Sequence, residues 1–299
     1  MKKFISIIIA VTAVTSLTAQ QIPISENYFL DKYSFATAYA GNFNTRFLFL
    51  GYRSDWSGID GGPRTFRLSF NNSFMKNAGY GVKMIYDRAG IFDQLYVLAS
   101  YSYRVSVSEE HNLLFGLSAG IYRNTLNMSD YYNDPNYNLD PALISQNVKS
   151  KLKFMSDASV VWKWNTLEAG FMFTNISFGD AAYNEVDVTY KPLANFQIHA
   201  LKDFSISEKF NLIPVVIVRG GKYIKSQFEA AAQLVYQQKV WLGLAYRDPQ
   251  VIGAGVGASL GSSLKLSYNF NFASGVAMNV FNNHEIILGV NLFEIAGKK

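Results

Sequence analysis

Three residues near the carboxyl end have the spacing of a nucleotide-binding turn. Gly253, Gly255 and Ala258 fit the pattern G-x-G-x-x-G/A, in which glycines let the backbone approach a pyrophosphate held by a helix N-terminus. That chemistry needs a strand before the glycines and a helix after them. Residues 259–263 read SLGSS, which is typical of a turn, and residues 264–272 alternate apolar and polar side chains, which predicts a strand. Because no helix is available, the sequence argues against a dinucleotide site.

The histidines give no recognisable catalytic site either. His111, His199 and His284 are the three in the chain. A hydrolase needs a nucleophile activated by a base, and no local triad signature accompanies any of them. The chain has no cysteine, which excludes disulfides, zinc–thiolate sites, catalytic thiols and a lipoprotein anchor. We therefore expect a protein that is not an enzyme and that uses no cofactor.

The composition points away from a surface that faces only water. The 299 residues are 49% hydrophobic and 15% aromatic, and 16% are charged. Soluble domains carry about a quarter of their residues as charges, so part of this surface is expected to face something else. The formal net charge of +5 is too small and too scattered to indicate a nucleic-acid partner.

The amino terminus has the three parts of a secretory signal peptide. Lys2 and Lys3 form a basic start, residues 4–14 are an apolar run, and residues 15–19 are mostly small. The apolar run is shorter than the roughly 20 residues that a membrane-spanning helix needs. We expect residues 1–19 to be a signal peptide that is cleaved after Ala19.

The mature chain divides into segments in which apolar and polar residues alternate. Phe66, Leu68 and Phe70 alternate with polar residues, and the glycine-rich stretch 251–260 has the same period of two. Segments of about ten residues with this pattern are the signature of an antiparallel transmembrane β-barrel. We predict about fourteen strands. They start near residues 46, 64, 79, 94, 112, 152, 167, 190, 209, 223, 239, 250, 262 and 284.

The predicted connections alternate in length, as outer-membrane barrels require. Short turns alternate with connections that are mostly longer, which a soluble β-sandwich, the other interpretation of the alternation, has no reason to do. The longer set covers residues 55–62, 87–93, 124–151, 179–189 and 274–283. We therefore assign residues 46–299 to the barrel. Residues 20–45 alternate poorly, and we expect them to be a plug in the lumen or a segment along the periplasmic rim.

The longest outer loop, residues 129–146, offers contacts rather than metal ligands. Its aspartates do not have the spacing of a calcium-binding loop, and we expect no metal there. Its tyrosines, Tyr131, Tyr132 and Tyr137, are candidates for contact with a partner protein, because aromatic residues are enriched at interfaces. They could equally pack over the mouth of the barrel.

Two stretches together carry a family resemblance. Residues 38–41 read AYAG, and residues 52–65 read YRSDWSGIDGGPRT. The second has a physical interpretation of its own: its glycines permit a tight turn, and Pro63 restricts entry into the next strand. Together they resemble the PorP/SprF family, and the similarity extends to residues 101–104, 114–120 and 284–286. The chain departs from the family in carrying Ala-Thr where Asn-Pro usually precedes AYAG.

The resemblance implies a place and a function. PorP/SprF proteins are outer-membrane components of the type IX secretion and gliding machinery of Bacteroidetes. It implies a non-enzymatic barrel in outer-membrane lipid, with a secreted adhesin or cargo at the outer loops and a periplasmic lipoprotein or peptidoglycan-binding subunits at the other rim. The candidate docking residues are Tyr52, Arg53, Trp56, Gly58, Gly61, Pro63, Tyr131, Tyr132 and Tyr137. The alternative is a channel or transporter for small or hydrophobic solutes.

Overall fold

The structure is a computed structural model. It describes residues 25–26, 28–41, 46–128, 147–178, 181–182, 189–190, 195–221, 224–273 and 282–292. No helix in these ranges is long and apolar enough to cross a membrane. The signal peptide expected at residues 1–19 and the three tyrosines of residues 129–146 lie outside the described residues.

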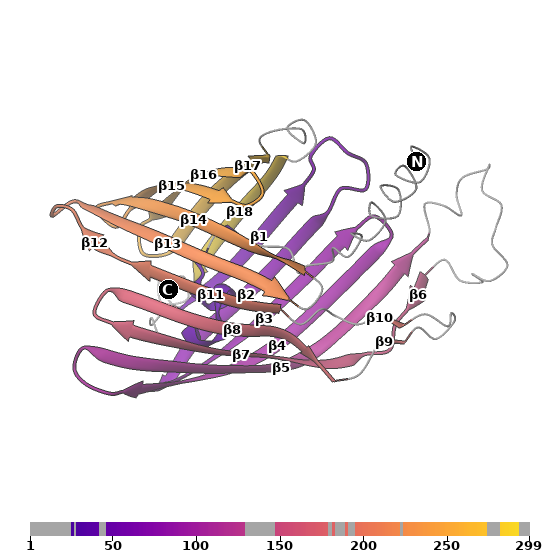
Figure 1. Ribbon diagram of the computed structural model, residues 1–299, viewed down its shortest axis with the longest axis horizontal. Coiled ribbons are helices and arrows are strands. Elements are labelled where there is room, and N and C mark those ends of the chain that lie inside the picture. Colours follow the sequence, from indigo (N-terminus) through magenta and orange to yellow (C-terminus); the bar gives the residue numbers. More distant parts are fainter. Residues whose placement is uncertain are drawn as a thin grey trace, which may run out of the picture.

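Fourteen long antiparallel strands in the described part of the chain close into a barrel (Figure 1). Neighbours in sequence pair in order, and β1 pairs with β18 to complete the ring. Closure satisfies the backbone hydrogen bonds that an open edge would leave unpaired in lipid. The strands are β1 (Phe47–Asp55), β2 (Arg64–Met75), β3 (Ala78–Ala89), β4 (Phe92–Ser106), β5 (His111–Asn127), β7 (Lys153–Trp164), β8 (Leu167–Ser177), β11 (Asn195–Lys202), β13 (Phe210–Gly221), β14 (Ile224–Tyr236), β15 (Val240–Arg247), β16 (Val251–Leu260), β17 (Leu264–Ala273) and β18 (Asn282–Asn291).

Short elements complete the described chain. Strands β6 (Asn147–Lys149) and β12 (Phe204–Ser205) attach to the ring, and β9 (Ala181–Ala182) pairs with β10 (Thr189–Tyr190). Two short helices precede the barrel: α2 (Lys32–Phe35) and the 3₁₀ turn η1 (Thr37–Tyr39).

The period-two prediction is confirmed, including at the glycine-rich stretch. Residues 251–260 form β16, and a turn at residues 261–263 leads into β17, so no helix follows the glycines. One predicted connection is wrong: residues 87–93 are not a longer loop. Strand β3 continues to Ala89 and β4 begins at Phe92, because Gly90 adopts a positive φ of 58° that permits a two-residue turn. Asp87 belongs to the strand and accepts a hydrogen bond from Thr65.

Large apolar side chains cover the outside of the ring. Leu117 and Leu242 are each 58% exposed and Leu244 is 68% exposed, whereas their strand neighbours Ser118 and Trp241 point inward and are buried. A monomer in water rarely presents so extensive an apolar surface, whereas the lipid-facing band of a membrane barrel requires one.

Aromatic side chains gather at one end of this outer face. His111, Trp162 and Trp164 stack with ring centroids 5.7–6.2 Å apart, beside the turn at residues 165–166. Phe210 and Tyr236 pair at 5.0 Å at the same end of the barrel. Rings with an apolar body and a polar tip suit the level of the lipid headgroups. His111 is the first residue of β5, where its ring stacks on both tryptophans.

Connection lengths orient the barrel. At one end the connections are short: residues 76–77, 107–110, 165–166, 203–209, 237–239 and 261–263. At the other end lie all the longest ones, at residues 56–63, 128–152, 178–194 and 274–281, and the described residues also form tight turns there at 90–91 and 248–250. Periplasmic turns are short and outer loops are long, so we call these the periplasmic end and the outer end.

Candidate functional site

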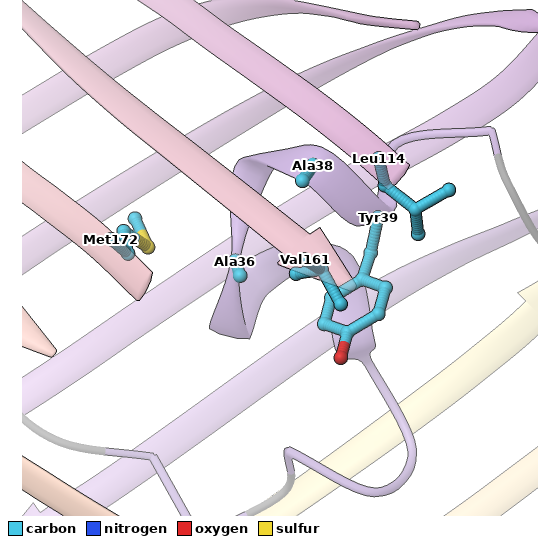
Figure 2. Close-up of a cluster of buried hydrophobic side chains, with 6 residues drawn as sticks. All are labelled: Ala36, Ala38, Tyr39, Leu114, Val161 and Met172. Atoms are coloured by element: carbon cyan, nitrogen blue, oxygen red, sulfur yellow. The ribbon is translucent and has the colours of Figure 1, made fainter. Parts of the chain in front are cut away.

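Residues 25–26 and 28–41 lie inside the ring, and we call the stretch 25–41 the lumen segment. It includes α2 and η1, and Tyr33, Ala36 and Tyr39 within it are at most 2% exposed. Figure 2 shows Ala36, Ala38 and Tyr39 of this segment beside the wall residues Leu114 and Val161. Apolar burial of this kind is the main favourable term that keeps a segment in place.

Other apolar contacts extend along the lumen segment. Tyr28 packs with Leu201, Val215 and Ile217 of the wall. Leu30 packs against a second buried cluster, formed by Phe47, Phe49 and Ile287. The segment therefore contacts strands on several sides of the ring.

At its outer end the segment places an acid among wall cations. The Glu26 carboxylate accepts hydrogen bonds from Arg53 at 3.3 Å, from Asn271 at 3.2 Å and from Arg247. Arg53 also pairs with Asp55, with 2.8 Å between Nη2 and Oδ1. Glu26 and both arginines are buried, and charges stay ionised in such a place only when they are paired and hydrogen-bonded.

Two wall carboxylates complete this outer cluster. Glu229 is fully buried and accepts hydrogen bonds from the Tyr28 hydroxyl at 2.9 Å, Arg247 Nε at 3.1 Å and Arg219 Nη1 at 2.5 Å. Glu285 accepts from the Ser25 hydroxyl at 2.7 Å and from the backbone N–H of Glu26 at 2.9 Å. Charged or polar side chains of five strands thus contact the outer part of the lumen segment. The strands are β1, β14, β15, β17 and β18.

A second polar cluster lies toward the periplasmic end. Lys32 Nζ lies 2.8 Å from Glu168 Oε2, and the Tyr39 hydroxyl donates to the same oxygen at 2.9 Å. The Tyr39 hydroxyl also lies 3.2 Å from His199 Nε2, and Lys163 pairs with the other oxygen of Glu168 at 3.1 Å. Glu168 is the second residue of β8, so this cluster marks the level of the short turns.

Between the two clusters, wall hydroxyls bind the segment. The Tyr33 hydroxyl lies 2.8 Å from Ser100 Oγ, and Thr37 Oγ1 lies 3.0 Å from Ser118 Oγ. Ser159 Oγ accepts from the backbone N–H of Ala38 at 2.7 Å. Asp31 caps α2 by accepting from Ser34 N, and Ser69 donates to its other oxygen. Small polar residues at inward positions of the strands therefore serve as hydrogen-bonding partners of one particular peptide.

Wall glycines make room for this peptide. A Cβ at Gly81 would come closer than 3.0 Å to the Tyr33 ring, and one at Gly116 equally close to the backbone of Thr37 and Ala38. At Gly79 the obstacle would be the backbone of Ala40. A glycine has no Cβ, so it lets another backbone approach a strand at this distance.

A buried ion pair links two wall strands through the lumen, beside the Tyr33 ring of the segment. Lys83 Nζ on β3 lies 2.7 Å from Asp157 Oδ2 on β7, and both side chains are at most 5% exposed. Strands β4 and β5 separate β3 from β7 in the ring, so this contact crosses the interior. The other Asp157 oxygen accepts from the backbone N–H of Asn175 at 3.1 Å.

The structure divides the residues of the 52–65 motif between two environments. Tyr52 faces outward and is 44% exposed, whereas its neighbour Arg53 points into the lumen and binds Glu26. The sequence-based prediction of Arg53 as an outer docking residue is therefore wrong, because its side chain is buried in the lumen. Adjacent residues of a strand point to opposite faces, which is why one motif serves both.

The rest of the motif is a rigid turn at the outer end. Trp56, Gly58 and Gly61 adopt positive φ values of 55°, 103° and 77°. The turn is closed by hydrogen bonds from Asp55 N to the Pro63 carbonyl at 2.8 Å, from residue 59 N to the Trp56 carbonyl at 3.0 Å, and from residue 62 N to the carbonyl of residue 59 at 3.1 Å. It also docks on β18, where the Ser57 hydroxyl donates to Asn282 at 2.9 Å. The predicted tight turn is present, and its glycines are needed for its shape.

The carboxylates of the outer cluster were not predicted from the sequence. Glu229 and Glu285 are buried beside the outward-facing Phe228 and Ile286, so the period of two indicates their lumen face but not their partners. Glu26 carries no such signal, because the stretch around it does not alternate. Within the described residues, no group of three or more histidine, aspartate or glutamate side chains is arranged to hold a metal ion.

The chain is similar to one known protein family. A family model described as "Type IX secretion system membrane protein PorP/SprF" matches residues 17–290. The search of curated proteins gave no match.

Among solved structures, the "CymD monoaromatic hydrocarbon channel" aligns with a TM-score of 0.54 and 13% identity, over 90% of this chain and 93% of that one. A Pseudomonas aeruginosa FadL homologue aligns with a TM-score of 0.48 and 10% identity, over 81% and 88% of the two chains. At such low identity the likeness to the hydrocarbon channel shows a shared fold alone.

Proposed function

The chain belongs to the PorP/SprF family of type IX secretion system membrane proteins, and we propose that it serves this system without catalysis, by docking partner proteins at the two ends of its barrel. It is an outer-membrane barrel, by family and by fold. The observation that carries the proposal is the rigid turn of residues 55–63, which presents apolar side chains at the outer end.

The outer turn has the properties of a docking surface. Trp56 is 39% exposed and Ile59 is 45% exposed, while the hydrogen bonds of the turn fix the backbone beneath them. Large aromatic residues dominate binding energy at interfaces, and a fixed backbone lowers the entropy lost on binding. The partner we propose here is a secreted adhesin or another cargo protein, as in gliding machinery.

The periplasmic end offers a separate surface. Val107 and Ile206 lie in two of the short connections and are 63% and 61% exposed. Exposed aliphatic side chains on otherwise polar turns suit contact with a protein. We assign this end to a periplasmic lipoprotein or a peptidoglycan-binding subunit of the same system.

A channel or transporter for small or hydrophobic solutes is the second candidate. A cavity of about 140 Å³ lies between the lumen segment and the wall and is lined in part by Phe35, Phe49 and Phe196. A cavity of this size holds a molecule about as large as benzene. Docking comes first, because the lumen segment fills the interior around this space.

The docking proposal predicts that changing the outer turn weakens cargo retention. The double variant Trp56→Ala, Ile59→Ser is expected to lower the amount of type IX cargo held at the cell surface at least ten-fold, because such anchors typically contribute about 2 kcal/mol or more each. The measurement is mass spectrometry of surface-exposed proteins in the native host.

The matched control keeps both apolar side chains. Asp60→Asn changes an exposed polar residue of the same turn and should leave surface cargo in place. Heat-modifiable mobility on gels confirms that both variants form barrels. Unchanged cargo in the Trp56→Ala, Ile59→Ser variant, with normal barrel levels, would refute docking at this turn.

A further inference from the structure

The lumen segment has a direction. Glu26 contacts Arg53, two residues before the outer end of β1, and Arg247, the last residue of β15. Gly41, at the other end of the segment, donates its N–H to Asn71 at 2.9 Å and packs beside Gly79, the second residue of β3. The segment therefore runs from the outer end, where Glu26 lies, to the periplasmic end, where β1 begins.

The wall recognises this segment by charge as well as by shape. At the outer level an acid, Glu26, meets two arginines, and at the periplasmic level a cation, Lys32, meets Glu168. Charge complementarity at both levels fixes the register of a bound chain and disfavours a reversed one. Between them the Tyr33 and Thr37 hydroxyls meet wall serines. This is the pattern of a bound peptide: side-chain anchors in matching pockets along an extended site.

The contacts between the lumen segment and the wall do not depend on the peptide link that joins the segment to β1. Only residues 42–46 join the segment to β1, and the wall residues that hold it come from strands all around the ring. Barrels of about eight strands fill their interior with wall side chains, whereas those of about 16–18 leave a water-filled channel. A ring of fourteen strands lies between these cases, and here a separate piece of chain supplies the filling.

We infer that the lumen is a peptide-binding site, that residues 25–41 are its bound ligand, and that their binding closes a passage which the emptied barrel offers to water and ions. The ligand class is an acidic and aromatic peptide, with a carboxylate toward the outer end and tyrosines with a lysine toward the periplasmic end. The inference concerns the isolated barrel, so it stands or fails independently of the docking function.

The test uses the full chain with a site-specific protease sequence inserted between Gly41 and Arg46, so that the barrel folds with its segment in place. Current across planar lipid bilayers is recorded before cleavage, after cleavage, and after cleavage of a form carrying Glu26→Gln and Lys32→Met to speed release. Mass spectrometry reports whether the segment has left. We expect a closed barrel before cleavage and steady conductance once the segment has left.

Synthetic peptides then test the binding site itself. A peptide of residues 25–41 in the bath should close the emptied barrel. The Glu26→Gln peptide should need at least a ten-fold higher concentration, because it loses its charge-assisted bonds to two arginines. A scrambled peptide of the same composition should leave the current unchanged. An emptied barrel that does not conduct, or closure by the native and scrambled peptides at the same concentration, would overturn the inference.

Discussion

Replacing Lys83 by methionine is expected to lower the free energy of unfolding by about 3–5 kcal/mol. The substitution leaves Asp157 as an uncompensated carboxylate in a site where its side chain is 4% exposed. Removing one partner of a buried pair costs more than the pair contributes, because the remaining charge has lost its solvation and its counter-charge. The measurement is guanidinium unfolding of the barrel in lipid vesicles.

A second substitution separates this electrostatic cost from lost packing. In the double variant Lys83→Met with Asp157→Asn, neither side chain is charged. The side-chain amide oxygen introduced at position 157 can still accept a hydrogen bond from the backbone N–H of Asn175. The double variant should recover most of the lost stability. Lys239→Met, in an exposed turn, serves as the control and should change stability by less than about 0.5 kcal/mol. A double variant no more stable than Lys83→Met alone would show that the pair is not coupled.

Gly116→Ala is expected to dislodge the lumen segment. The added methyl group would come closer than 3.0 Å to the backbone of Thr37 and Ala38, and neither the strand nor the 3₁₀ turn can yield as a flexible side chain would. Overpacking of this kind costs about 1–3 kcal/mol. Because the clash lies between wall and segment, we expect the cost to appear as easier opening of the segment rather than as unfolding of the barrel.

Trypsin offers a clean measurement of that opening. Lys32 is the only lysine or arginine among residues 20–45, and in the folded protein it is held against Glu168. Cleavage of an opened segment follows the population of the open form, so Gly116→Ala should speed cleavage after Lys32 roughly ten-fold or more. The control is Gly243→Ala, where a Cβ would meet its nearest atom at 3.9 Å. Equal cleavage rates in the two variants would contradict the proposed fit.

The wall of the barrel could be predicted from the sequence because lipid imposes a strict alternation on each strand. The residues of β16 illustrate this: Ile252, Ala254 and Val256 face outward, and Gly253 and Gly257 face inward. The same parity placed Arg67 and Ser69 inside. One face of each strand contacts lipid and the other faces the lumen, so apolar and polar residues alternate along it. This alternation is visible in the sequence even when the neighbouring strands are unknown.

The interior could not be predicted in the same way. Glu26 forms hydrogen bonds with Arg247 and Glu285, which lie more than 200 positions away in the sequence. No local sequence pattern predicts such contacts. Apolar and polar residues do not alternate regularly along the lumen segment, because it contacts several strands on different sides of the ring. The motif residue Arg53 shows the consequence: its conspicuous position suggested a partner at the surface, whereas it binds the chain's own segment.

Disulfide trapping shows whether the lumen segment occupies the interior of the native barrel. The chain has no cysteine, so a pair can be introduced without background. Thr37→Cys with Ser118→Cys replaces two hydroxyls whose oxygens lie 3.0 Å apart. Thr37→Cys with Ser267→Cys, on β17 six strands away around the ring, is the matched control. We predict that mild oxidation of intact outer membranes links the first pair rapidly and leaves the control reduced, as seen by gel mobility and mass spectrometry. If the first pair links no faster than the control, the lumen segment does not occupy this site in the native barrel.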